Sequence, residues 1–430
     1  MRLKRQLGLF TVTISAIGII LGAGIYALIG EAAGISGYWI WLGFVVAALV
    51  AMFTGLSYAE LSSMIPKAGA EFDYSKAAFG RKVGFFTAWI LALAGFISAA
   101  AVAWGFGNYF HALTGFSAMY SAIGLMVVCA IVIYAGVKQA TTIAGAMTII
   151  EILGLVIVVV AALPLFLSGR IPAQLFDFTG FSITPILQTA ALLFFAFIGF
   201  EEITRLSEET KNARENIPKA LLAAIFFSTV IYILVAIAAV TIVTPAELAQ
   251  SSAPLGLVVG TVLGSEGFFA LSLIALAATA STVLLIMLAT SRLIYGIAED
   301  NALPKFIAEV DKKTNTPTTA ILITAAAAII FVFFGNISTV ASATDFLLFI
   351  AFIIVNLSVI QLRFTQPNAK RPFRIPLSVG NFPLTAAFGI AACIILIAST
   401  KIEVIIVGSA LVIIGIVFEA YYSKNSNFAP

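Results

Sequence analysis

Histidine, cysteine and charged side chains are scarce in this chain of 430 residues. Its one histidine, His111, cannot form a His-rich metal site, and neither H-E-x-x-H nor the phosphate-binding loop G-x-x-x-x-G-K-[ST] occurs. The two cysteines, Cys129 and Cys393, lie in separate apolar segments, which argues against a disulfide framework. We therefore expect a protein that is not an enzyme, carries no cofactor and does not use ATP.

Charged residues make up only 10% of the chain, whereas hydrophobic residues make up 61% and the mean hydropathy is +1.11. A soluble protein of this size carries about 25% charged residues, so the composition indicates a polytopic membrane protein in contact with the lipid bilayer. Basic patches with interleaved aromatic residues are absent, which excludes nucleic acid as a partner. The alternating ten-residue strands of a membrane β-barrel are also absent, so the predicted fold is all-α.

Apolar runs of about 20 residues, the length that crosses the hydrocarbon core, predict twelve transmembrane helices. They cover 8–34, 38–64, 82–112, 116–136, 140–168, 183–206, 218–244, 264–297, 317–335, 340–362, 382–399 and 402–422. The first follows "MRLKR" but exceeds a signal-peptide core and lacks an A-x-A cleavage site at its end. With the N-terminus inside, 21 of the 23 lysines and arginines fall on the cytoplasmic side, all but Arg170 and Lys401. This asymmetry predicts cytoplasmic N- and C-termini in the plasma membrane.

The first predicted span contains "IILGAG", where Gly22 and Gly24 interrupt the helix pattern. Close helix packing through small residues is one interpretation. The other is a break, because backbone groups freed at membrane depth are tolerated where they line a ligand site.

The sixth span has a second irregularity, at Gly199, followed by Glu201 at a depth where a carboxylate is costly. Spans 1 and 6 cross the membrane in opposite directions. Matched breaks in two such halves point to an inverted-repeat transporter whose substrate site lies between them. The expected repeats cover 7–168 and 183–362 within one transporter domain, with two appended spans over 382–422.

The direction of each half-helix predicts what the breaks bind. Free amides at Gly22, Ala23 and Gly24 begin the outer half of span 1 and suit a carboxylate. Carbonyls at the end of the outer half of span 6, together with those that end the inner half of span 1, suit an ammonium group; these belong to Phe197, Ile198, Ile19 and Ile20. The two receptors together fit an α-amino acid.

Five stretches resemble the signatures of the amino acid-polyamine-organocation (APC) superfamily of permeases. They are "GAGIYALIG", "SYAELSSMIPKAGAEFDYSKAAFG", "FFAFIGFEEIT...EETKNARENIPKA", "SRLIYGIAEDNALPKF...TP" and "VNLSVIQLR...QP...RPFRIP", in the family's order from residue 7 to about 376. The resemblance implies the LeuT-like five-plus-five fold with alternating access. It matches residues 22–24 to the carboxylate-binding turn, residues 197–199 to the unwound ammonium-binding segment, and Phe195 to the aromatic gate.

Glu151, in the fifth span, departs from the family pattern, because proton-coupled relatives often carry lysine at the matching position. Two functional interpretations follow: a titrating carboxylate, or a cation such as sodium held by Glu151, the span 1 carbonyls and Ser281/Thr282. The alternative is a permanently neutral glutamic acid that bonds a neighbouring helix. Ser281 and Thr282 have their own alternative, a bond to a carbonyl one turn back.

Glu201 has two interpretations that are not exclusive: it caps the inner half-helix and pairs with Arg205, or it acts in gating. Lys67, Glu71, Asp73 and Lys76 are interpreted as a solvated cytoplasmic face. The predicted function is cation-coupled amino acid transport, with proton or sodium as the coupling ion. An exchanger, a polyamine permease, and a channel or receptor are the alternatives. Because no acidic residue clearly stands in the pocket, neutral substrates are favoured.

Overall fold

The computed structural model describes residues 7–67, 69–299, 303–311, 313–314, 316–333 and 337–425, without the side chains of 137–146 and 418–425. Four of the basic residues used to orient the chain, Arg2, Lys4, Arg5 and Lys312, lie outside the described residues. The chain is helical apart from its loops and one antiparallel pair of two-residue strands, β1 (Ser378–Val379) and β2 (Phe382–Pro383). The predicted all-helical membrane architecture is therefore confirmed at this level.

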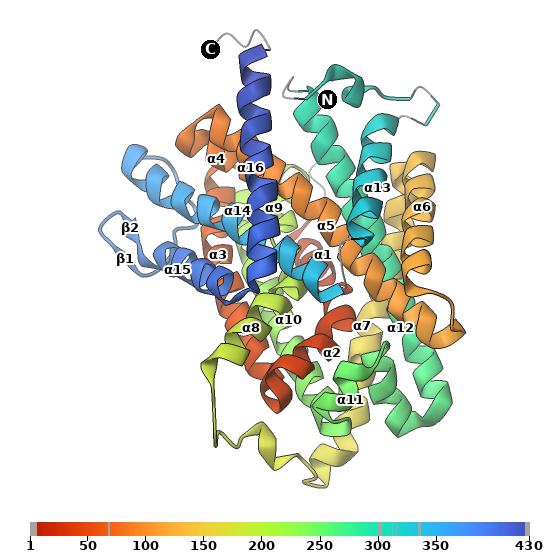
Figure 1. Cartoon of the computed structure of the whole chain (residues 1–430). Helices are drawn as coiled ribbons and strands as arrows, with labels where there is room; N and C mark the ends of the chain where they lie inside the picture. The colour runs from red at the N-terminus through yellow and green to blue at the C-terminus, as the bar shows by residue number, and fades with distance from the viewer. Residues whose placement is uncertain are drawn as a thin grey trace.

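The helices form one bundle (Figure 1). Their bounds are α1 Leu9–Ile20, α2 Gly24–Ser36, α3 Ile40–Met64, α4 Ala70–Phe79, α5 Arg81–Thr114, α6 Ala118–Ala135, α7 Val137–Leu167, α8 Ile183–Leu193, α9 Glu202–Arg205, α10 Ala213–Ile242, α11 Pro245–Gln250, α12 Pro254–Glu299, α13 Thr318–Val332, α14 Ile337–Thr365, α15 Leu384–Ser399 and α16 Ile402–Asn425. Short 3₁₀ turns are η1 Gly37–Trp39, η2 Ala173–Leu175, η3 Phe194–Phe197, η4 Leu206–Glu208 and η5 Lys305–Ala308.

Within the described residues, eight helical stretches are long and apolar enough to cross a membrane, or nine with the pair α15–α16 counted as one span bent by 118°. The predicted count of twelve stays a prediction. Part of the difference is length, because α1 has 12 residues and α13 has 15, short of a full crossing. The predicted span 264–297 lies within α12, and its predicted start coincides with a kink at Gly264, whose φ of 74° separates the helix that begins at Pro254 from the one that follows.

Helices α5 and α14 form the interior and pack on each other; α5 also packs on α12, and α10 packs on α3. The broken elements α1, α2, α8 and α9 lie among them (Figure 1). Large apolar side chains exposed on α6, α7 and α16, such as Ile131, Leu153 and Ile413, face outward as lipid-facing residues do. In Figure 1, α4 and the last turns of α16 lie at one end of the bundle, and α11 lies at the other.

A buried ion-pair cluster fixes the segment after α14. The Glu60 carboxylate accepts from Arg363 Nε at 2.8 Å, from the Ile375 amide at 2.8 Å, and pairs with Arg371 Nε at 3.2 Å. Glu60 and Arg363 are both almost fully buried. Because every ion in the cluster has a partner of opposite charge, the cluster joins α3 and α14 to the segment that follows α14 without an unpaired ion.

Candidate functional site

Two helices break where the glycines predict it. α1 ends at Ile20, residues 21–23 are not helical, and α2 begins at Gly24. On the other side, α8 passes into the 3₁₀ turn η3, the chain unwinds at Ile198, and α9 begins at Glu202. Gly199 has a φ of 115°, which only glycine adopts without strain, so this residue permits the second break.

The two breaks touch each other. A Cβ built on Gly24 would lie 2.6 Å from the Cα of Ala196, so the backbones meet without room for a side chain. Tyr232 of α10 joins the breaks, because its hydroxyl lies within hydrogen-bonding distance of the Ile20 carbonyl and 2.8 Å from the Ala196 carbonyl. Freed carbonyls of both unwound segments thus have a buried polar partner, as helix breaks require.

A cavity of about 260 Å³ lies at the breaks. Eleven of the thirteen residues predicted for the site line it: Ile19, Ile20, Gly22, Ala23, Gly24, Glu151, Phe195, Ile198, Gly199, Ser281 and Thr282. The other two do not. Phe197 is fully buried and its ring packs edge-on against Tyr232, with centroids 5.3 Å apart. Glu201 lines a neighbouring cavity of about 60 Å³.

The backbone groups expected to bind substrate are only partly free. The Ala23 amide donates to Thr282 Oγ1 at 3.2 Å, and the Ile20 carbonyl is engaged by Tyr232. The Gly22 and Gly24 amides have no hydrogen-bond partner in the part of the chain that the structure describes. Two unpaired donors at the positive end of α2 therefore remain for an anionic group.

Glu151 of α7 is 2% exposed and lies against α12. The Ser281 hydroxyl contacts its Oε1, while Ser281 and Thr282 each reach the Ala278 carbonyl at 2.9 Å. The bonds back to Ala278 are the ones expected for hydroxyls inside a helix. Across the described residues, no group of three or more His, Cys, Asp or Glu side chains could hold a metal ion.

The structure corrects one expectation about Glu201. Its carboxylate accepts from the Gly199 amide at 3.0 Å, on the unwound segment, and makes no cap bond to α9. Arg205 pairs instead with Glu202 at 2.7 Å, and with Glu71 of α4 at 3.5 Å. The physical reason is packing: α4 brings a second carboxylate beside the guanidinium, and Glu202 lies on the turn that faces it.

Glu71 also corrects the interpretation of α4 as a solvated face, because it is 1% exposed. Its carboxylate accepts from the Tyr58 hydroxyl at 3.1 Å and contacts Arg205. Burial raises the pKa of the Glu71 carboxyl, and the neighbouring Arg205 guanidinium opposes that rise. Lys67 and Asp73 form an outer pair at 3.8 Å, with Lys67 mostly exposed, so part of the face is solvated.

Sequence reasoning missed three polar residues that line the 260 Å³ cavity: Ser98, Thr148 and Glu202. Thr148 stands three residues before Glu151, a spacing that places both on one helix face, and this signal was available. Ser98 interrupts an alanine-rich run of α5. Glu202 adjoins Glu201, and the sequence alone does not distinguish which of the two faces the cavity.

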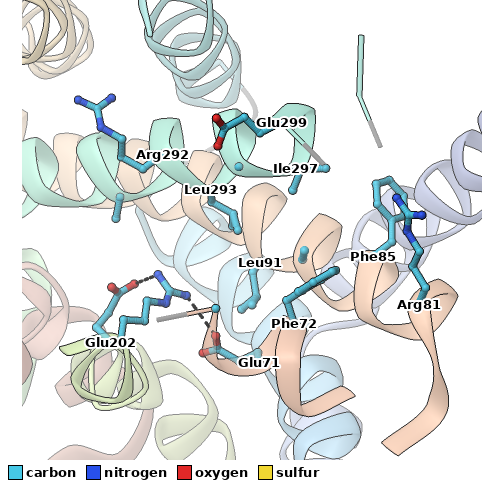
Figure 2. A pocket seen from close by; sticks show the side chains of 15 residues that line it. Glu71, Phe72, Arg81, Phe85, Leu91, Glu202, Arg292, Leu293, Ile297 and Glu299 are labelled. Carbon is cyan, nitrogen blue, oxygen red and sulfur yellow. Dashed lines mark hydrogen bonds and ion pairs between the residues drawn. The ribbon is translucent and has the colours of Figure 1, made fainter. Parts of the chain in front are cut away.

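A larger cavity of about 460 Å³, the vestibule, opens beside α4; Glu71, Arg81, Glu202, Arg205, Arg292 and Glu299 are its charged lining residues (Figure 2). Dashed lines in Figure 2 mark the Arg205 contacts to Glu202 and Glu71. The 60 Å³ cavity, the neck, shares five lining residues with the 260 Å³ cavity and five with the vestibule, and Glu202 and Ala289 belong to both sets. Glu202 is therefore the charged residue that borders all three.

An apolar helical bundle with two broken helices beside a central cavity defines a multi-pass membrane protein. The sequence comparison agrees with this class and narrows it. Residues 7–420 match the family model described as "Amino acid permease", and the chain belongs to that family, within the APC superfamily. Amino acid transport is the activity that this membership supports.

Named relatives cover most of the chain. It is 28% identical to the branched-chain amino acid permease BcaP of Bacillus subtilis, over 98% of this chain and 94% of that protein. It is 28% identical to the methylthioribose transporter of Bacillus subtilis, over 87% and 84%. Cationic amino acid transporter 2 of Arabidopsis thaliana is also 28% identical, over 82% of this chain and 59% of that protein.

Proposed function

We propose that this protein is a secondary active transporter that carries amino acids across the plasma membrane by alternating access. In this proposal the chain has twelve spans in a LeuT-like five-plus-five arrangement over 7–168 and 183–362, two appended spans, and cytoplasmic termini. One observation carries the proposal: the unpaired Gly22 and Gly24 amides and the unwound segment of η3 and Ile198 line the same 260 Å³ cavity. An α-amino acid offers the matching carboxylate and ammonium group.

Apolar side chains favour a neutral, apolar substrate. Val102, Phe195, Ile198, Leu285 and Ile286 line the cavity. The Glu202 carboxylate at its edge is engaged by Arg205, so it does not demand a cationic substrate. The branched-chain permease among the relatives agrees with this choice. A cationic amino acid is the second candidate, because relatives are named cationic amino acid transporters and Glu151 and Glu202 both reach the cavity.

Glu151 is the candidate for ion coupling, by a proton or by sodium bound with Ser281 and Thr282. Its burial beside the cavity and its contact with Ser281 support this role. Exchange of one amino acid or amine for another is the alternative to coupling, and polyamine transport is a further alternative within the same family resemblance. A channel or receptor would not require two touching helix breaks.

A ligand screen tests the proposal. The purified protein is heated with each of the twenty amino acids and with polyamines, and we expect leucine, isoleucine or valine to raise the melting temperature most. A ligand at a hundred times its Kd stabilises by about 2.7 kcal/mol. In proteoliposomes, uptake of the selected amino acid should saturate and be accelerated by unlabelled amino acid inside. Flux that neither saturates nor accelerates indicates a channel, and no stabilising amino acid refutes the proposed substrate class.

A further inference from the structure

Asp345 is a buried carboxyl that the proposed transport site does not use. It lies on α14, is 1% exposed, and neither Oδ1 nor Oδ2 has a hydrogen-bond partner among the described residues. The other buried carboxylates each have a polar partner: Glu60 pairs with Arg363 and Glu71 with Arg205, whereas Glu151 contacts the Ser281 hydroxyl and Glu201 accepts from the Gly199 amide. An isolated ionised carboxylate in an apolar interior costs several kcal/mol, so this residue needs an explanation.

The position of Asp345 connects it to the second helix break. α14 packs on η3, the backbone of Phe195 interacts with the Asp345 carboxyl, and Phe195 also lines the 260 Å³ cavity. One turn further along α14, Phe349 packs on Phe194 with ring centroids 4.8 Å apart. Thr344, the residue before Asp345, lines the neck. Asp345 therefore adjoins the aromatic segment that borders the proposed substrate.

Among the described residues, no acidic or basic side chain offsets the charge of the Asp345 carboxylate. The group that interacts with this carboxyl is the backbone of Phe195. The elements packed against α14 include α2, α3, α4, α5, α8, α15 and α16. Their acidic and basic residues with described side chains are Glu31, Glu60, Glu71, Asp73, Lys76, Arg81, Lys82, His111 and Glu403. Glu60 binds Arg363, which is eighteen residues further along α14, or about 27 Å at 1.5 Å per residue.

Of the cations that could neutralise the Asp345 carboxylate, a proton fits its surroundings and a metal ion does not. A metal cation needs several oxygen ligands, and Asp345 does not line the 260 Å³ cavity, the neck or the vestibule. A proton needs neither space nor further ligands, and it removes the isolated charge. We propose that Asp345 binds and releases a proton during the transport cycle, and that its protonation state controls the position of Phe195 over the substrate; this rests on the proposed transport function.

The coupling follows from hydrogen-bond chemistry. A protonated carboxyl has one O–H donor and can hold a carbonyl of the unwound segment, whereas the ionised form accepts only and favours backbone amides such as that of Phe195. When the proton is lost, Asp345 therefore releases the backbone carbonyl and binds backbone amides instead. In this proposal the proton leaves to water and returns from it; Asp345 itself lines none of the three cavities, and the residue before it that borders the neck is Thr344. Asp345 is a positioning residue, since it acts through Phe195.

The test compares Asp345→Asn, which stays neutral, with Asp345→Glu, which still titrates. Ser358→Ala is the matched control, because Ser358 is buried on the same helix and bonds only its own turn, to Ile354 O at 2.8 Å. Uptake of leucine into proteoliposomes is measured across pH. A step that depends on one proton, up to about tenfold per pH unit, should be lost in Asp345→Asn, shifted along the pH axis in Asp345→Glu and unchanged in Ser358→Ala.

Infrared difference spectra give a readout that does not require transport. Ligand-free wild type should show the C=O band of a protonated carboxylic acid that is absent in Asp345→Asn and moved in Asp345→Glu. If Asp345→Asn does not fold, the shift of the band in Asp345→Glu still tests whether the band belongs to residue 345. An unchanged band pattern, or a pH profile of Asp345→Asn equal to that of wild type, overturns the inference. Absence of leucine uptake in wild type, with the band present, refutes the proposed function instead.

Discussion

Gly24 and Ala196 meet across the two helix breaks so closely that a Cβ on Gly24 would lie 2.6 Å from the Ala196 Cα. The contact joins the start of α2 to the 3₁₀ turn η3, the two segments that border the central cavity. Any side chain at 24 must push these backbones apart. The geometry of the cavity thus depends on the absence of a single methyl group.

Three glycine-to-alanine substitutions test how much an added methyl group disturbs the breaks. Gly24→Ala forces backbone movement and should cost about 1–3 kcal/mol, with a matching loss of amino acid affinity. Gly22→Ala should be milder, because its Cβ would meet Thr282 Oγ1 at 3.1 Å, and a side chain can move. Gly124→Ala is the control, with nothing within 4 Å of its Cβ. Melting temperature and Kd are measured for all three; equal behaviour at 24 and 124 contradicts the contact.

Tyr232→Phe tests the polar link between the breaks. The change removes the hydroxyl that engages the Ile20 and Ala196 carbonyls, so buried acceptors lose their donor, at about 1–3 kcal/mol. We expect a lower melting temperature and weaker amino acid binding, because both unwound segments loosen. Tyr120→Phe is the control, since that side chain is 60% exposed. Normal affinity in Tyr232→Phe would show that the segments hold their positions without this link.

Glu151→Gln tests ion coupling. If Glu151 carries the coupling proton, the variant should still exchange substrate but fail to concentrate it, and its uptake should lose the pH dependence between about 6 and 8. If Glu151 helps to hold sodium, wild-type uptake should rise with external sodium and the variant should lose that response. Glu403→Gln, at an exposed position on α16, is the control. A variant that concentrates substrate with unchanged pH and sodium profiles assigns Glu151 a structural role.

Glu71→Gln gives a pH prediction with a defined sign. Because burial raises the pKa of this carboxyl in the folded protein, its stabilising contribution is complete below the unfolded value of about 4.3 and is lost as the pH rises through the raised value. The melting temperature of Glu71→Gln minus that of wild type should therefore increase over that window. Arg205→Met removes the opposing charge and should extend the window to higher pH. A difference that does not change with pH contradicts this argument.

Arg363→Met tests the buried ion pair with Glu60. Removing one partner leaves an uncompensated buried charge, which costs about 3–5 kcal/mol, although Arg371 reduces the loss. Arg374→Met is the matched control, because Arg374 is exposed on the same connecting segment. Thermal denaturation in detergent measures both. A similar small effect at the two positions would mean that the pair contributes little.

The helix breaks could be predicted from the sequence because their causes are local. Glycines at 22, 24 and 199 are compatible with close helix packing as well as with a break, and the matched positions of the two irregularities favour the break; the residues around them do line one cavity. Partners from distant segments could not be predicted. The Ala23 amide bonds Thr282, 259 positions away, and Arg205 meets Glu71, 134 positions away. Such contacts depend on how the helices pack, which no local pattern encodes.

Phe197 and α4 show where local patterns mislead. The place of Phe197 near Gly199 predicts a carbonyl in the site, yet this residue does not line the cavity: its ring packs on Tyr232, and its carbonyl accepts from the Phe200 amide at 3.5 Å. The charges of α4 look like a solvated face, yet packing against α14 and α5 buries Glu71. In both cases the sequence spacing is compatible with either orientation, and tertiary contacts decide.

Because the neck lies between the 260 Å³ cavity and the vestibule, we expect two kinds of transport inhibitor, one for each cavity. A competitive compound must fit about 260 Å³ between the helix breaks, so it has to resemble the transported solute. A compound lodged in the vestibule has about 460 Å³ available and meets a different set of charges, those of Arg81, Arg292 and Glu299. Such a compound need not resemble the proposed solute. We expect it to inhibit transport when it is applied to the side of the membrane at which α4 lies, and to have no effect when it is applied to the other side.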